Sequence, residues 1–325
     1  MKGTFAGRPM GWLPGEQPQA YAQIQAVVLA DKGDESGAGA YRDQFRAASG
    51  LELDKLSRDE LVNQVAQAVA DFMRSLNSPM NSPYDQFIKL NKLEAAPAAA
   101  ESSPAFAAKL LAKVVALEKA GSLKLPTGFE TAALDGFKIF FRVEGATAVG
   151  NCVACHAPPL FTDYSYHNLG ISQVEYDQMH GAGKFAVLSI PDAATAVRPA
   201  AQFRETPTRA RPGEVDLGYW NFADLKKSPW RRAEENDTQF LRRLIGTFKT
   251  PGLRHLAYSY PYMHTGAYGS LEDTLAEIMR LSEMARAGEV RAADEELKRI
   301  SISEAQIVPL VAFLKTLSED LKRRY

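Results

Sequence analysis

The two cysteines of this chain stand three positions apart, at Cys152 and Cys155, and His156 follows the second one directly. This C-x-x-C-H spacing is the attachment signature of a c-type haem. Two thiols one turn apart add to the two vinyl groups of one porphyrin, and the adjacent histidine presents a ring nitrogen to the iron. The motif therefore predicts one covalent haem c, bound by Cys152, Cys155 and His156, with His156 as a metal ligand.

Other uses of a C-x-x-C pair fit this chain less well. A thioredoxin-type redox motif needs a βαβ context, and no such pattern surrounds the pair. A zinc site would need a second histidine pair at H-x₃₋₅-H spacing. The five histidines offer none: His156, His167, His180, His255 and His264. A disulfide between the cysteines would leave the adjacent histidine unexplained, so haem attachment is favoured.

Length and composition narrow the class of protein further. A chain of 325 residues is long enough for two domains, and 46% hydrophobic with 24% charged residues is ordinary for a globular protein. The net charge of −1 gives no electrostatic basis for binding nucleic acid. No apolar run reaches the length of a membrane span. We therefore expect no nucleic-acid partner and no membrane span.

Helix signals recur along the chain. Capping-box patterns occur at Ser57–Glu60 and Thr127–Glu130, and two further helix starts are expected at Ser270–Asp273 and Ser303–Gln306. Apolar residues at helical spacing follow each of the four. The second of these helices leads into the haem motif, and Pro309 should distort the first turns of the last one. Residues 94–106 are rich in Ala, Ser and Pro and predict a linker or surface loop.

The patterns predict an all-α fold. No convincing strand alternation and no internal repeat is present, and more than 80 residues after His156 show little periodicity, which predicts a long irregular segment. We expect a partial N-terminal helical domain without a haem motif over residues 1–125. A c-type cytochrome domain with long irregular loops should follow over residues 126–325.

Several segments together resemble one known family. The matching segments are Asn77–Phe87, Phe137–His156, Leu160–Gly170, Phe248–His255 and Pro261–Gly266. In this order they resemble the bacterial di-haem cytochrome c peroxidases and the related MauG. The resemblance covers residues 57–325 and implies haem c, a calcium ion, a periplasmic location, hydrogen peroxide reduction with a cytochrome c donor, and a homodimer. It also implies a small redox protein as electron donor or acceptor.

Three departures from the family pattern bear on activity. Family members carry two C-x-x-C-H motifs, whereas this chain has only the one of the electron-transfer domain. Phe5–Arg8 resembles the segment after the first haem motif, with Phe5 in place of a tryptophan. Leu29 stands near the position of the peroxidase glutamate. We therefore expect the chain to begin partway through the first domain or to have lost its export signal, without the peroxide-cleaving haem and its acid–base residue.

The second axial ligand of the iron decides between electron transfer and catalysis. The resemblance places this ligand on the helix after Pro261–Gly266, where an ungapped count falls on Ile278 and a one-residue slip gives Met279. Met279 is therefore the expected metal ligand, although core packing explains many helical methionines equally well. Met263 and His264 are the next candidates, followed by Tyr262 or an open position.

Three further features have alternative interpretations. Arg254 either pairs with a haem propionate or forms an ordinary surface ion pair. His264 either ligates iron or bonds a propionate or the backbone, whereas His167 and His180 are expected to be surface or loop-bonding residues. The basic residues Lys226, Lys227, Arg231 and Arg232 form either a solvated face or a docking patch for an acidic redox partner.

The sequence favours one function and leaves two alternatives open. The favoured function is electron transfer through one covalently bound haem with both axial positions filled. The first alternative is peroxidase or MauG-like oxidase activity, at an open haem or as part of a longer di-haem enzyme, with a distal acid or base drawn from His264, Glu272, Asp273 and Glu277. The second is a binding protein that senses a gas or engages a partner without turnover.

Overall fold

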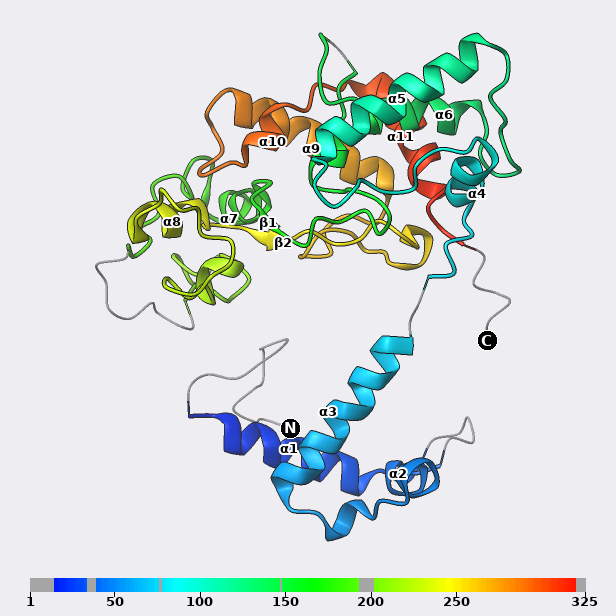
Figure 1. Cartoon of the computed structure of the whole chain (residues 1–325). Helices are drawn as coiled ribbons and strands as arrows, with labels where there is room; N and C mark the ends of the chain where they lie inside the picture. The colour runs from blue at the N-terminus through cyan, green and yellow to red at the C-terminus, as the bar shows by residue number, and fades with distance from the viewer. Residues whose placement is uncertain (1–14, 34–38, 76–77, 147, 193–201, 320–325) are drawn as a thin grey trace. The chain divides into compact units, whose positions relative to one another are not determined.

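The computed structural model describes residues 15–33, 39–75, 78–146, 148–192 and 202–319 (Figure 1). These residues form eleven α-helices and one two-stranded sheet, so the expected all-α class is confirmed. Phe5–Arg8, which carried part of the family resemblance, lies outside the described residues. The contacts divide the chain into two compact units, Met1–Pro79 and Met80–Tyr325.

The first unit is a small helical cluster. Its helices are α1 (Gln17–Ala30), α2 (Tyr41–Ser49) and α3 (Arg58–Ser75), with a 3₁₀ turn at Leu53–Lys55. α3 begins at the expected capping box, because the Glu60 side chain accepts hydrogen bonds from Ser57. A core of Val28, Leu53 and Leu61, with Leu29 packed against it, joins α1 to α3. Farther along α3, Val69 and Phe72 are exposed within the unit.

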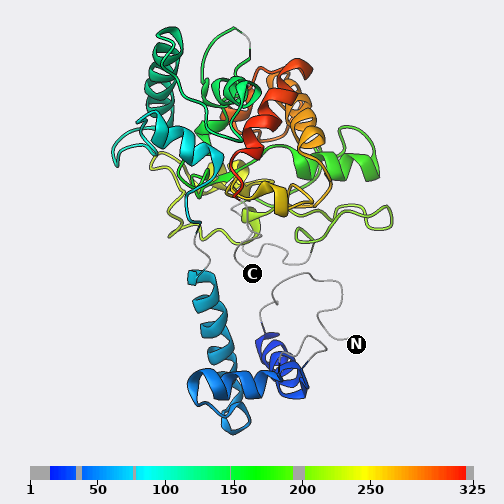
Figure 2. The ribbon, with the colours of Figure 1, turned by 90° about the vertical axis from the view of Figure 1, so that its right-hand side faces the viewer.

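The second unit is built around two helices in close contact. α6 (Thr131–Phe141) and α11 (Glu304–Lys315) meet where Gly136 faces Pro309, and a Cβ on Gly136 would lie 1.9 Å from the Pro309 carbonyl oxygen. The backbones can approach this closely only because Gly136 has no side chain. α9 (Leu271–Arg286) packs beside α11, as both views show (Figures 1 and 2).

Aromatic rings fill the core of this unit. Phe313 of α11 makes edge contacts with Phe137 and Phe161 and a tilted contact with Phe140. α4 (Pro83–Leu90) and α5 (Ser103–Lys119) contribute further buried residues to the same core. α4 and α5, which we had expected in an N-terminal domain ending at residue 125, therefore pack in the same unit as the haem motif.

The segment after His156 is more ordered than the sequence suggested. It contains α7 (Ile171–His180), α8 (Asp237–Arg243) and the antiparallel strands β1 (Tyr166–His167) and β2 (Phe248–Lys249). It also has its own core, in which Phe203, Trp220 and Phe240 are fully buried. Most of the described residues in this stretch still lie outside helices and strands, so the expected long irregular segment is confirmed, but the sequence did not reveal that it folds around a core of its own.

Two helix starts differ from expectation. α5 begins at Ser103, inside the expected linker, with Ser102 as its cap and a proline in its first turn. α6 begins at Thr131 rather than at the Thr127 capping box, and its cap residue makes no side-chain bond. The expected starts at Ser270 and Ser303 do begin α9 and α11, with a capping box at Ser303 and a single side-chain cap at Ser270. The last short helix, α10 (Glu295–Lys298), lies between them.

Among the described helices, none combines the length and apolar character needed to cross a membrane.

Candidate haem-binding site

The C-x-x-C-H segment forms a tight turn after α6. Asn151 has a left-handed backbone (φ 50°), and Cys152–Ala154 then form a single 3₁₀ turn. The His156 amide donates to the Cys152 carbonyl at 2.8 Å. Gly150 lies so close to the end of α6 that a Cβ there would be 2.5 Å from the Ile139 carbonyl oxygen. The two cysteines and the histidine are thus presented from one compact turn.

His156 has the hydrogen bonding of a proximal haem ligand. Its Nδ1 donates to the Phe161 carbonyl oxygen at 2.9 Å, so the lone pair of the neutral ring lies on Nε2, the atom that would bind a metal. Burial lowers the pKa of His156, so the ring is neutral at neutral pH. A neutral imidazole with one fixed nitrogen is the form in which histidine binds iron.

Both cysteines are free thiols, as haem attachment requires. Burial raises the pKa of Cys152 to about 12 and also raises the pKa of Cys155. The Cys152 thiol lies 3.3 Å from the Gly150 carbonyl oxygen. Together with the orientation of His156, these unpaired thiols fit a c-type haem.

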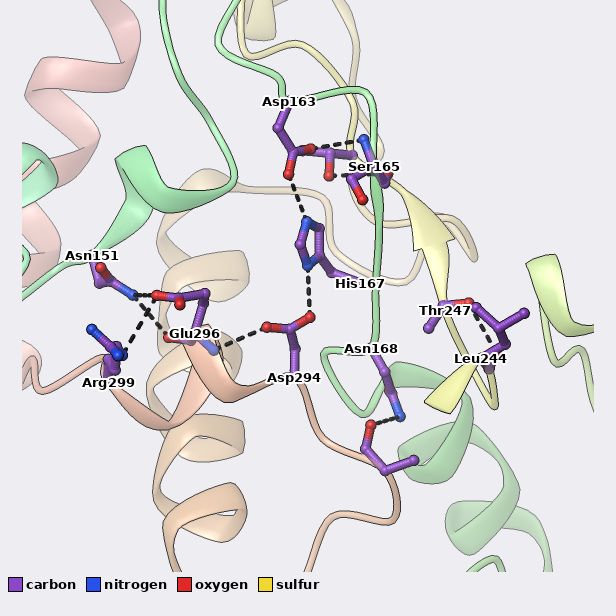
Figure 3. A network of polar contacts seen from close by, with 12 residues as sticks. Asn151, Asp163, Ser165, His167, Asn168, Leu244, Thr247, Asp294, Glu296 and Arg299 are labelled. Carbon is purple, nitrogen blue, oxygen red and sulfur yellow. Dashed lines mark hydrogen bonds and ion pairs between the residues drawn. The ribbon is translucent and has the colours of Figure 1, made fainter. Parts of the chain in front are cut away.

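The ring of His167 is held between two carboxylates, an arrangement that we call the imidazole clamp: Asp163, His167 and Asp294 (Figure 3). Nε2 lies 2.8 Å from Asp163 and Nδ1 lies 2.7 Å from Asp294. Burial by itself would lower the pKa of His167, but the hydrogen bonds to these carboxylates raise it to about 12. His167 is therefore a doubly donating imidazolium, and the sequence had suggested only a loop-bonding role for it.

The imidazole clamp lies against the haem motif. Sγ of Cys155, a carboxylate oxygen of Asp163 and a ring nitrogen of His167 lie within 4.8 Å of one another. In the described part of the chain, they are the one group of three such side chains close enough to share a metal. Both ring nitrogens already face carboxylates, and the sulfur and nitrogen donors do not suit calcium. The calcium implied by the family resemblance stays a prediction.

Side-chain amides connect the haem motif to the region around α10 (Figure 3). The Asn151 amide donates to the Glu296 backbone carbonyl at 3.0 Å and to its carboxylate at 2.9 Å. The Asn168 amide donates to the carbonyls of Arg291 and Ala292, and the Asp294 amide donates back to Asn168. These bonds attach Asn151, which precedes the haem motif, and Asn168, which follows β1, to residues 291–296 after α9.

Arg254 is engaged by the protein itself. Its Nη atoms bond both carboxylate oxygens of Asp85 at 2.8 Å, and its Nε donates to the Pro159 carbonyl at 2.7 Å. The guanidinium also lies over the Phe161 ring, 5.6 Å from its centre. With only 6% of the Arg254 side chain exposed, this is a buried ion pair rather than the surface pair considered from the sequence. Its pairing with a propionate stays a prediction.

The axial-ligand candidates lie around α9. Met279 is partly buried against the aromatic core, and the same core includes Val153 and Cys152 of the haem motif. Tyr262 packs against this core as well, whereas Met263 packs against the neighbouring cluster around Leu281. His264 stacks face to face on Phe248, with 3.4 Å between ring centres. Ligation by Met279 or His264 stays a prediction.

The remaining candidates have ordinary partners. Arg231 forms an ion pair with Asp237 and donates to the Glu235 carbonyl, so the structure uses it internally. The Asp224 side chain accepts from the backbone amides of Lys226 and Lys227. His180 contacts the ring of Tyr176. The sequence analysis gave no role to Asp85, Phe161, Asp163 and Asp294, although the first three lie in the segments Asn77–Phe87 and Leu160–Gly170 that resemble the family.

No family model matches the sequence, but curated relatives do. The cytochrome-c peroxidase IdrP1 of Denitromonas iodatirespirans is 29% identical over 167 residues, which cover 51% of this chain and 36% of the relative. The methylamine utilization protein MauG of Methylorubrum extorquens is 30% identical over 186 residues, or 57% and 34%. The cytochrome-c peroxidase IdrP2 of a Pseudomonas species is 30% identical over 194 residues, or 60% and 41%.

The fold and the C-x-x-C-H turn together define a helical haem-binding domain. Over about half of its length, this chain is a homologue of the bacterial cytochrome c peroxidases and MauG, which confirms the resemblance read from the motifs. The chain spans between 34% and 41% of the length of the relatives just described. Haem is the cofactor that this homology supports.

Proposed function

We propose that this chain carries electrons through one haem c, attached by Cys152 and Cys155 and ligated by His156 and Met279. The hydrogen bond from His156 Nδ1 to Phe161 is the observation that carries the proposal, because it leaves the lone pair of the neutral ring on Nε2, the atom that would bind iron. When bound, the haem would supply a one-electron couple. The chain would fix the proximal ring, hold the thioether sulfurs and exclude water with its aromatic core.

The proposal also includes a cellular location and a redox partner, both of which the relatives suggest. The haem requires attachment outside the cytoplasm, so we place the chain in the periplasm. A small redox protein would supply or accept the electron through a small transient interface. Of the basic residues considered for such an interface, Lys226 and Lys227 are better candidates than Arg231, because Arg231 is paired with Asp237.

A second candidate function follows from the names of the relatives. Homology to cytochrome-c peroxidases and to MauG favours peroxidase or oxidase activity, at an open haem or within a longer di-haem enzyme. Such activity needs a distal acid or base near the iron. Glu272 and Asp273 are the first-turn acids of α9, the helix that also carries Met279.

Haem staining after denaturation, followed by a redox titration, tests the main proposal. The full chain would be matured with the cytochrome c assembly system, and Cys152→Ala with Cys155→Ala would serve as the matched variant. We expect haem to stay with the unmodified chain after denaturation, to be lost from the double variant, and to titrate reversibly with one electron. Haem retained by the double variant would refute the attachment, and turnover of peroxide by the isolated chain would favour the second candidate.

A further inference from the structure

The imidazole clamp holds the ring of His167 in one position, and the function proposed above gives this ring no role. His167 is bonded at both nitrogens, at 2.8 Å to Asp163 and 2.7 Å to Asp294, and only 18% of its side chain is exposed. Charge-assisted hydrogen bonds of this kind are stronger than neutral ones. Rotation of the ring would break both bonds, so its position is set by two segments that lie more than a hundred residues apart.

Each carboxylate of the clamp is itself held in place. Asp163 accepts a hydrogen bond from the Ser165 amide at 2.9 Å. Asp294 caps α10, where its side chain accepts from the Glu296 amide at 2.9 Å. Each carboxylate that holds the ring is thus itself oriented by a backbone amide two residues further along the chain.

The clamp contacts one of the two cysteines in particular. The Asp163 amide donates to the Cys155 carbonyl at 2.8 Å, and the Cys155 sulfur lies within 4.8 Å of the clamp's ring nitrogen and carboxylate oxygen. Cys152 is held differently, with its thiol directed at the Gly150 carbonyl and its side chain packed against the aromatic core. The sulfurs of Cys152 and Cys155 thus have different sets of neighbouring contacts.

We propose that the imidazole clamp positions the Cys155 sulfur for its thioether bond, so that His167 is a positioning residue for haem attachment at that cysteine. The inference rests on the proposed function. The bond forms by addition: the S–H bond and the π bond of a vinyl group break, a C–S bond forms, and the proton ends on the terminal vinyl carbon. No oxidant or reductant is consumed. Such an addition needs the sulfur in one place and orientation.

Counting thioether bonds in variants tests the proposal. The full chain and its variants would be matured with the cytochrome c assembly system and digested, and free Cys155 in the haem peptide would be alkylated and identified by mass. The α band of the pyridine adduct gives a second readout, because it moves to longer wavelength when one vinyl group remains. Cys155→Ala supplies the reference with one thioether. Asp237→Asn, which breaks the ion pair to Arg231, supplies a matched control away from the haem motif.

We expect His167→Ala to lose the thioether at Cys155 and to keep the one at Cys152, with Asp294→Asn showing the same selective loss to a smaller extent. Asp237→Asn should keep both bonds. Two intact thioethers in both clamp variants would overturn the proposal, and so would equal loss at both cysteines, which indicates general unfolding. If His167→Ala does not accumulate, the thioether counts of His167→Gln and Asp294→Asn take its place, with the same outcomes supporting or overturning the proposal. An unmodified chain without covalent haem would instead refute the proposed function.

Discussion

Nδ1 of His156 lies 2.9 Å from the carbonyl oxygen of Phe161, and Phe161 itself has a positive φ of 58°. Such a backbone is costly for a bulky residue and persists where the surroundings enforce it. The Phe161 ring is fully buried and makes an edge contact with Tyr84, with 5.1 Å between ring centres. The aromatic core therefore holds the backbone that aims this carbonyl at the histidine.

Replacing Met279 should leave the second axial position of the haem iron without its protein ligand. If its thioether is the second axial ligand, Met279→Ala should convert a low-spin visible spectrum to a high-spin one. Met284→Ala is the matched control, because Met284 lies on the same helix but packs in the cluster around Leu281. An unchanged spectrum in Met279→Ala would remove Met279 as ligand, and a change in both variants would point to a disturbed helix.

The contact between α6 and α11 should tolerate no side chain at residue 136. A Cβ on Gly136 would lie 1.9 Å from the Pro309 carbonyl oxygen, so Gly136→Ala must push the helices apart. We expect a loss of about 3 kcal/mol in the free energy of unfolding, typical of severe overpacking. Urea unfolding followed by circular dichroism measures it. Gly269→Ala is the control, because nothing lies within 4 Å of its Cβ position; equal stability of both variants would contradict this packing.

Loss of Arg254 should destabilise the second unit strongly. Arg254→Ala leaves the Asp85 carboxylate without its bidentate partner, and only 15% of that side chain is exposed. Removing one member of such a buried pair costs about 3–5 kcal/mol. Thermal or urea unfolding provides the measurement. The exposed pair of Lys315 with Glu272 offers the comparison, since both side chains are more than half exposed and Lys315→Ala should cost less than about 1 kcal/mol.

Asp85 should also contribute to acid sensitivity. Burial would raise its pKa, but the hydrogen bonds from Arg254 and Ser82 outweigh burial and hold the pKa below the ordinary value of 3.8. A pKa that is lower in the folded state contributes stability above the unfolded value and loses it as the pH falls through the folded value. Asp85→Asn should therefore flatten the fall in unfolding free energy below about pH 4. An identical slope in both proteins would contradict the assignment.

Helices with local signals could be predicted from the sequence. The serine caps at Ser57, Ser270 and Ser303 lie within three residues of their partners, so the pattern alone reveals them. The same pattern failed at Thr127, because α6 begins four residues later without a side-chain cap. The start of α5 was missed because Pro104, which suits the first turn of a helix, was taken as a sign of a linker.

Long-range contacts explain what the sequence could not reveal. The histidine and the two cysteines of the haem motif are contiguous, so their chemistry was evident. Asp294 lies 127 residues from His167, and Asp85 lies 169 residues from Arg254. Only folding brings these partners together. The core around Trp220 was missed for the same reason, because its members come from short elements without helical periodicity.

The visible spectrum of the reduced protein before and after carbon monoxide tests the central claim most directly. The account predicts a low-spin spectrum that carbon monoxide leaves unchanged, because His156 and Met279 occupy both axial positions of a single covalent haem. A high-spin spectrum that shifts on addition of carbon monoxide would show an open iron. That result would contradict the electron-transfer account and favour catalysis at this haem.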